Sequence, residues 1–222
     1  MRAVIYSGSG GTEVIRFGDV PKPEVRPGYI RVRVHAAGLN RADLIQRRGH
    51  YAAPPGWPAD IPGLEYAGEV EAVREVSRWK VGDRAMGLVG GGAMAEYVTV
   101  HQDEALAIPS ALSYAEAAAI PEVFLTAYDA LVMRGRLAAG ERVLIHAVGS
   151  GVGTAATQIA KHLGIGRASV YRALVTDAYS GGSDSASLLR PAISTGTPRR
   201  NRGIETVGRQ PSSAPTAWVC CT

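Results

Sequence analysis

Residues 140–161 constrain the fold most, because the patterns of a strand, a turn and a helix follow one another within this stretch. Residues 142–147 form a short apolar run typical of a buried strand, residues 148–153 are rich in glycine, and residues 154–161 have the spacing of a helix. Glycines let the backbone approach a ligand closely, and the free N–H groups at a helix start attract an anion. The stretch predicts a phosphate-holding strand, turn and helix; the alternative is a turn that is glycine-rich for structural reasons alone.

The composition is that of a soluble globular protein. The 222 residues are 46% hydrophobic, and the formal net charge of +4 permits an anionic ligand without indicating a nucleic acid. No apolar run reaches the roughly 18 residues of a membrane helix, and no signal peptide precedes the first strand-like segment. The two cysteines, Cys220 and Cys221, are adjacent, which excludes a disulfide framework or a cysteine-rich zinc site. We expect a cytoplasmic protein with no membrane partner.

Residues 1–110 have the pattern of a compact β-rich domain. Arg2–Tyr6 is apolar, whereas Tyr29–His35 and Gly68–Val73 alternate between polar and apolar residues at the strand period. Many proline and glycine turn signals separate these runs. Short strands with this spacing predict a small irregular barrel.

Residues 111–175 contain the phosphate turn and are predicted to form a partial nucleotide-binding domain. Ser113 and Glu116 have the spacing of a capping box, which begins an alanine-rich helical segment that continues to about Arg134. Pro121 predicts a kink within this segment. We place the domain boundary near residue 110.

Several motifs occur in the order found in a known family. They are Ala37–Asp43, Gln46–Tyr51, Pro62–Gly68, Val81–Asp83, Ala117–Pro121, Leu125–Ala127 and His146–Lys161. Residues 1 to about 164 resemble the zinc-independent quinone oxidoreductases of the medium-chain dehydrogenase/reductase family. The resemblance implies an α/β protein with a β-rich first domain: a chaperonin-10-like barrel followed by a Rossmann domain, with the active site between them.

The resemblance also implies that no metal is bound. In zinc-using relatives, a cysteine before an aspartate and a Gly-His-Glu segment supply zinc ligands. Here Asn40 stands in place of the cysteine, and Leu64 in place of the histidine. Because a catalytic zinc usually needs three protein ligands, we expect no zinc and no alcohol oxidation. Glu65 is interpreted as a remnant of the zinc-site architecture.

Family members pass a hydride from a nicotinamide dinucleotide to a quinone or an activated alkene. The resemblance implies NADPH as the cofactor, with NADH as the open alternative, and a small quinone or enone as the substrate. Such an acceptor carries a conjugated carbonyl that takes up negative charge. Hydride delivery then depends mostly on positioning and a few hydrogen bonds.

Three residues are candidates on the substrate side: Asn40, Asp43 and Tyr51. Tyr51 matches the position of a proton donor in related enoyl reductases. In the alternative interpretation, Tyr51 is an amphipathic tyrosine at a loop edge, and Asn40 and Asp43 organise their loop by bonding nearby backbone.

On the cofactor side, the resemblance implies contacts with the nicotinamide and the phosphates. Thr126 matches a family threonine near the nicotinamide, and His146 is interpreted as a structural residue that closes the strand. The residues that match the phosphate turn are Ser150, Gly151, Val152 and Gly153.

The family pattern ends after Gly164. No second Rossmann strand is visible, and Ile165–Leu174 has the pattern of a short helix. Residues 176–222 are dominated by small and polar residues, which predicts disorder from about residue 178. We interpret this part as a tail that replaces the rest of the Rossmann domain, from a truncated, frame-shifted or fused reading frame. We therefore expect impaired activity and no dimer.

A second resemblance crosses this junction. Thr157–Leu174 is similar to the helix-turn-helix of resolvase-type recombinases. The resemblance implies that Arg167, Ser169, Tyr171 and Arg172 of this chain would be available to phosphates or base edges. The alternative function is thus a DNA-binding helix-turn-helix fused to a vestigial barrel, and under the leading hypothesis no nucleic acid is bound. A third hypothesis is that the first domain folds and pairs with another molecule.

Overall fold

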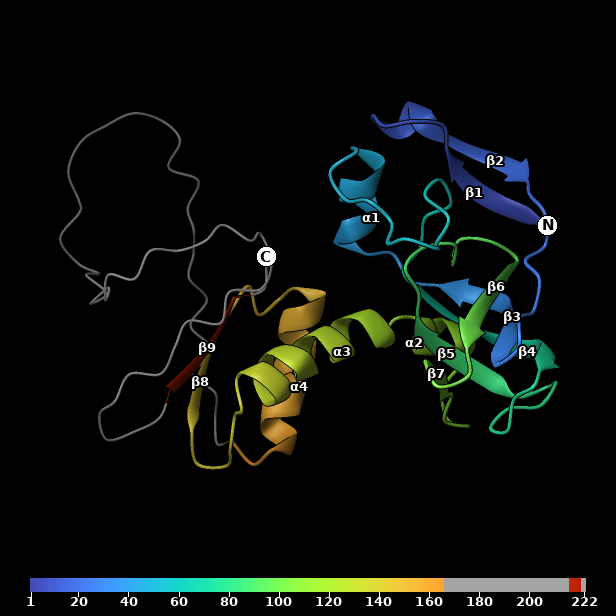
Figure 1. The fold of residues 1–222 in the computed structure, drawn as a ribbon. Helices are drawn as coiled ribbons and strands as arrows, with labels where there is room; N and C mark the ends of the chain where they lie inside the picture. The colour runs from blue at the N-terminus through green and yellow to red at the C-terminus, as the bar shows by residue number, and fades with distance from the viewer. Residues whose placement is uncertain (166–215, 221–222) are drawn as a thin grey trace, which may run out of the picture. The chain divides into compact units, whose positions relative to one another are not determined.

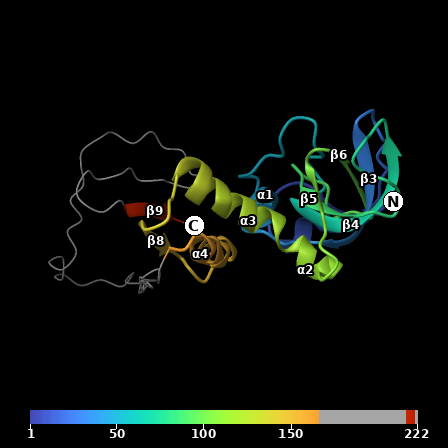
Figure 2. The ribbon, with the colours of Figure 1, turned by 90° about the horizontal axis from the view of Figure 1, so that it is seen from below.

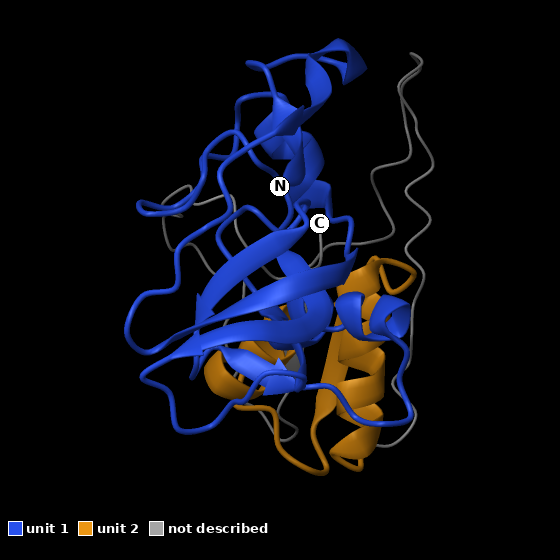
Figure 3. Cartoon of the chain, turned by 90° about the vertical axis from the view of Figure 1, so that its right-hand side faces the viewer, with its two compact units in different colours: residues 1–125 blue, residues 126–222 orange. Residues whose placement is uncertain are grey.

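The computed structural model describes residues 1–165 and 216–220, which belong to two units, Met1–Leu125 and Thr126–Thr222 (Figure 3). The domain limits inferred from the sequence, near residues 110 and 175, stay predictions. Among the described residues, no helix has the length and apolar character needed to cross a bilayer.

A five-stranded antiparallel sheet forms the core of the first unit, in the order β6-β3-β4-β5-β7 (Figure 1). Its side chains alternate between buried and accessible along β3, as the sequence pattern predicts. The fully buried residues include Ile30, Val32, Tyr66, Val70 and Val100. The strands are β3 (Tyr29–Ala37), β4 (Glu65–Arg74), β5 (Arg84–Leu88), β6 (Tyr97–His101) and β7 (Ala105–Ala107).

A smaller antiparallel pair, β1 (Arg2–Tyr6) and β2 (Ile15–Asp19), completes the strands of this unit, with a 3₁₀ turn at Thr12–Val14 between them. The edge of β1 that does not face β2 bonds to another part of the unit: Val4 donates its N–H to the Met94 carbonyl at 2.9 Å. The strands expected at residues 2–6, 29–35 and 68–73 are confirmed.

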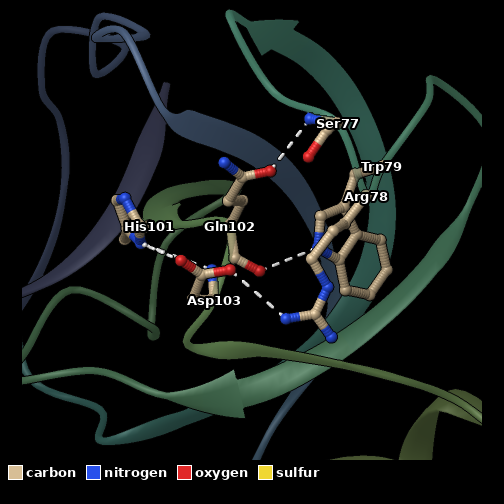
Figure 4. Close-up of polar contacts among 6 residues, drawn as sticks. All are labelled: Ser77, Arg78, Trp79, His101, Gln102 and Asp103. Atoms are coloured by element: carbon tan, nitrogen blue, oxygen red, sulfur yellow. Dashed lines mark hydrogen bonds and ion pairs between the residues drawn. The ribbon is translucent and has the colours of Figure 1, made fainter.

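The loop after β4 is held against the turn between β6 and β7 (Figure 4). Trp79 donates its ring N–H to the Gln102 carbonyl at 2.9 Å, and Ser77 donates its N–H to the Gln102 side chain at 3.0 Å. Arg78 pairs with Asp103 at 3.2 Å. These polar contacts add to the packing of Val76 and Trp79 against the core of the sheet, and together they hold the loop in place.

The alanine-rich segment forms two helices rather than one kinked helix. The capping box that begins α2 (Tyr114–Ala118) is confirmed, because Glu116 donates its N–H to Ser113 Oγ at 3.2 Å and accepts the Ser113 N–H at 2.8 Å. Pro121 is the first residue of α3 (Pro121–Tyr128), where its missing N–H leaves no hydrogen bond unmade. A π-helical segment, Asp129–Arg134, follows.

The second unit contains the predicted strand, turn and helix. Strand β8 (Arg142–His146) leads through the turn into α4 (Gly151–His162), which lies beside β8 (Figures 1 and 2). Strand β9 (Thr216–Cys220) pairs with β8 in parallel.

Strand β9 corrects one prediction. Disorder from about residue 178 is wrong for Thr216–Cys220, which forms a strand beside β8. Its sequence, Thr-Ala-Trp-Val-Cys, is rich in residues that favour strands, and β8 offers it a paired edge. The helix expected at Ile165–Leu174 and the second half of the helix-turn-helix lie outside the described residues beyond Ile165. Thr157–His162 is the end of α4.

Candidate functional site

Two of the predicted substrate-side residues lie together at the start of α1 (Arg41–Arg47). Asn40 precedes this helix and donates its backbone N–H to Asp43 Oδ2 at 2.7 Å. The other oxygen of Asp43, Oδ1, accepts the Gly63 N–H at 3.3 Å, and the side chain is buried, with 3% exposed. Both Asp43 oxygens therefore bond backbone groups, which is the geometry of a residue that organises its loop.

Glu65 is the residue that sequence reasoning set aside. It is the first residue of β4 and only 2% exposed. Its Oε1 accepts a hydrogen bond from Asn40 Nδ2 at 2.8 Å, and its Oε2 accepts the Glu122 N–H at 2.9 Å. A glutamate inside an otherwise apolar run, Leu-Glu-Tyr-Ala, was the available signal, since a buried charge normally has specific partners.

The backbone around Glu65 has no room for larger residues. A Cβ at Gly38 would lie 2.0 Å from Glu65 Oε1, so only glycine fits against this carboxylate. Gly63 has a φ of +101°, and a Cβ there would lie 2.6 Å from the Met94 nitrogen. These glycines allow the chain to close tightly around the carboxylates.

Three carboxyl groups share this poorly solvated region. Burial raises the pKa of Asp43, against the lowering effect of the N–H groups of Asn40 and Gly63. Burial also raises the pKa of Glu65, opposed by its two hydrogen bonds and reinforced by the charge of Asp43. For Glu122, burial and then the two neighbouring carboxylates raise the pKa. The cluster can therefore hold a proton at a higher pH than ordinary carboxyl groups do.

Tyr51, the third candidate, is not brought into this cluster. It lies in the loop after α1, is 42% exposed, and makes no hydrogen bond to any residue that the structure describes. Two surface hollows of the first unit lie beside Trp79 and Arg84 and beside Phe17 and His35, and none of the three candidates lines them. A role for Tyr51 stays a prediction.

In the second unit, Ser150 caps α4. Its Oγ accepts the Gly153 N–H at 3.0 Å, and its own N–H bonds the Ala147 carbonyl at 2.8 Å. A Cβ at Gly153 would lie 2.4 Å from the Ala147 oxygen, so glycine is needed where the helix passes the end of β8. This is the close approach of helix and strand that a phosphate-binding turn requires.

The first N–H groups of α4 remain available to a ligand. Those of Gly151 and Val152 bond no group among the described residues, and Gly151 is exposed. The Ser150 hydroxyl accepts one hydrogen bond and keeps its own hydrogen to donate. These donors lie at the positive end of a 12-residue helix, so the turn fits an anionic diphosphate. Thr126, in α3, is half-buried, and no side-chain hydrogen bond holds it in the described part of the chain.

Comparison with known proteins agrees with this arrangement. The family model for the alcohol dehydrogenase GroES-like domain matches residues 26–110. The human synaptic vesicle membrane protein VAT-1 homolog-like is 41% identical over 160 residues, which is 72% of this chain and 38% of the relative. A quinone oxidoreductase of Pseudomonas aeruginosa is 39% identical over 166 residues, covering 74% of this chain and 50% of the relative.

A solved structure gives the same result. The quinone oxidoreductase of Thermus thermophilus, described alone and in complex with NADPH, superposes with a TM-score of 0.62 at 40% identity. The match covers 74% of this chain and 51% of that one.

A GroES-like β-rich unit followed by a strand, a capped glycine turn and a helix defines the class: the chain belongs to the medium-chain dehydrogenase/reductase family. Within that family it is similar to the quinone oxidoreductases and the VAT-1 homologues, and the expected GroES-like fold of the first domain is confirmed. The chain spans half or less of the length of these two curated relatives.

Proposed function

We propose that the chain is a quinone oxidoreductase-like protein that binds a nicotinamide dinucleotide, preferentially NADPH, at the turn before α4. The observation that carries this proposal is the turn itself. Ser150 caps the helix, Gly153 allows the close helix–strand approach, and the N–H groups of Gly151 and Val152 are left for phosphate oxygens. When bound, the cofactor would supply the hydride.

On the acceptor side, we assign the hydrogen bond to the substrate carbonyl to Asn40. The acceptor would be a quinone or an activated alkene, whose carbonyl oxygen gains negative charge as the hydride arrives. The site needs no zinc in this proposal. The Asn40 amide nitrogen already donates to Glu65, and Leu64, 5% exposed, offers no metal ligand.

We further propose that hydride transfer is impaired in this chain. The similarity to these two relatives extends over 160 to 166 residues, which contain one strand, the turn and one helix of the cofactor domain. In a complete Rossmann domain, a residue after the second strand bonds the ribose. With the phosphate contacts alone, cofactor binding would be weak.

A titration of NADPH followed by its fluorescence tests the proposal. We expect binding in the range between micromolar and millimolar, and slow NADPH oxidation when 1,4-benzoquinone is added. Ser150→Ala should weaken binding, because it removes both the helix cap and a donor to phosphate. Gln158→Ala, on the exposed face of α4, is the matched control and should bind NADPH as the unaltered chain does.

Two results would contradict the proposal. If NADPH did not bind at concentrations up to millimolar, the assignment of the cofactor would be wrong. If NADPH bound as tightly as it does to full-length quinone oxidoreductases, the proposed impairment would be wrong, while the cofactor assignment would stand.

A further inference from the structure

We propose that Glu65 is a positioning residue that fixes the Asn40 amide for the hydride acceptor. This inference rests on the proposed function, in which Asn40 bonds the carbonyl of a quinone. The motivating observation is that the Glu65 carboxylate joins three separate segments of the first unit: the loop before α1, the start of β4, and the first turn of α3.

The orientation of the Asn40 side chain follows from its two neighbours. Asn40 and Asp43 form a capping box at the start of α1, and the Asn40 nitrogen Nδ2 donates to Glu65 Oε1 at 2.8 Å. An ionised carboxylate only accepts hydrogen bonds, so it selects the nitrogen end of the amide. The second N–H of Nδ2 bonds no group among the described residues and is the one left for a substrate carbonyl.

Glu65 is itself held rigidly. Its second oxygen, Oε2, accepts the Glu122 N–H at 2.9 Å, and its backbone carbonyl accepts the Gly38 N–H at 3.3 Å. The absence of a side chain at Gly38 creates the space that Oε1 occupies. The Glu65 side chain is bonded at both oxygens and only 2% exposed, so it has little freedom to move. It therefore holds the Asn40 amide in one orientation.

Glu65→Gln keeps the shape of the side chain but changes its hydrogen bonding. A glutamine has only one accepting oxygen, which can accept from either the Asn40 amide or the Glu122 N–H. Its NH₂ group then faces the other donor and cannot accept a hydrogen bond from it. We expect the KM for 1,4-benzoquinone to rise about tenfold, the effect of roughly one hydrogen bond, while the NADPH dissociation constant stays unchanged. Glu69→Gln, at an exposed position of the same strand, is the control and should leave both values unchanged.

A reversed pair separates positioning from stability. In the double variant Asn40→Asp with Glu65→Gln, the glutamine amide donates to the new carboxylate, so the hydrogen bond is restored in the opposite direction. The side chain at position 40 then has no N–H to offer a substrate. We expect the melting temperature to recover while the KM stays high. Recovery of both would show that Glu65 has a structural role only, and would overturn the proposal. This variant also serves if Glu65→Gln alone does not fold.

A second readout does not depend on activity. In the NMR spectrum of the free protein, we expect the exchange of the Asn40 side-chain amide with solvent to be at least about tenfold faster in Glu65→Gln, since one hydrogen bond is lost. Unchanged Asn40 signals, or an unchanged KM, would overturn the positioning role. If the unaltered chain binds NADPH but does not reduce the quinone, the proposed function fails, and the amide signals still decide the role of Glu65.

Discussion

The described cores of the two units differ mainly in how many large side chains they bury. In the first unit, the buried cluster contains Ile30, Val32, Tyr66 and several valines from a five-stranded sheet. In the second unit, five of the ten buried hydrophobic residues described are alanines, compared with seven of eighteen in the first. The buried hydrophobic residues described there are Ala127, Ala130, Leu131, Leu137, Val143, Ile145, Ala155, Ala156, Ala160 and Ile165.

This difference has an energetic meaning. Hydrophobic stabilisation grows with the apolar area that is buried, and an alanine buries far less than a valine, isoleucine or tyrosine. Among the described residues, the first unit buries eleven hydrophobic side chains larger than alanine and the second unit five, so the first has the greater means to fold on its own. Asn40, the proposed contact to the acceptor, belongs to the first unit, and the phosphate turn belongs to the second.

The largest effect should come from the same change made in each core. Ile30→Ala and Ile145→Ala each remove a buried isoleucine, and each should cost about 2–5 kcal/mol. We expect Ile30→Ala to leave a folded first unit, and Ile145→Ala to unfold the second unit alone. Hydrogen exchange read by mass spectrometry checks this: protection should disappear in residues 126–165 and persist in β3. Simultaneous loss in both units would mean that they unfold together.

A pair of glycines in the turn gives the next largest effect. A Cβ at Gly153 would lie 2.4 Å from the Ala147 oxygen, whereas none of the surrounding atoms lies within 4 Å of a Cβ at Gly149. We expect Gly153→Ala to destabilise the second unit by about 1–3 kcal/mol. Gly149→Ala should change the free energy of unfolding by less than about 0.5 kcal/mol. Equal effects in chemical denaturation would show that the turn differs from this geometry.

The same substitution, serine to alanine at a helix cap, can be made in each unit and its effects compared. Ser113 caps α2 in the first unit and Ser150 caps α4 in the second. Replacing either with alanine should cost about 1 kcal/mol, since each Oγ accepts one helix N–H. Only Ser150→Ala should also weaken NADPH binding. If Ser113→Ala weakened it equally, the loss would reflect stability rather than phosphate contact.

The smallest effect should be stabilising. The raised pKa values of Asp43, Glu65 and Glu122 mean that their ionised forms are disfavoured in the folded state. Their favourable contribution to the free energy of unfolding is therefore full at pH values below the pKa of the unfolded state. It is lost as the pH rises through the higher pKa of the folded state. Glu122→Gln should remove part of this repulsion and stabilise the first unit.

We expect Glu122→Gln to add about 0.5 kcal/mol at about pH 7 and less at about pH 4, because protonation of the carboxyl groups removes the repulsion. Thermal unfolding at the two pH values measures the difference. Glu24→Gln, an exposed control, should show no such pH dependence. A destabilising Glu122→Gln would mean that the Glu122 side chain makes a favourable contact.

Local patterns predicted the parts of the fold that depend on neighbours in sequence. Alternation identified β3 and β4, the Ser113–Glu116 spacing identified a helix start, and the glycine-rich run after β8 identified the turn. Each of these signals follows from hydrogen bonds or side-chain directions within a few residues.

Long-range contacts could not be predicted in this way. Glu65 is buried because the segments around Asn40 and Glu122 converge on the start of β4, and no local spacing encodes that meeting. The pairing of β9 with β8 is equally non-local. For the same reason, the sequence identified Asn40 and Asp43 through a family motif but gave no indication of the partner that orients Asn40.

The parallel pairing of β8 and β9 also bears on how the chain is made. Residues 147–215 separate the two strands, so β8 leaves the ribosome long before its neighbour has been synthesised. During that interval the strand edge that β9 later covers is open, while the sheet of the first unit can already be complete. The nascent chain should then bind chaperones through β8, and release from them should coincide with the emergence of Thr216–Cys220.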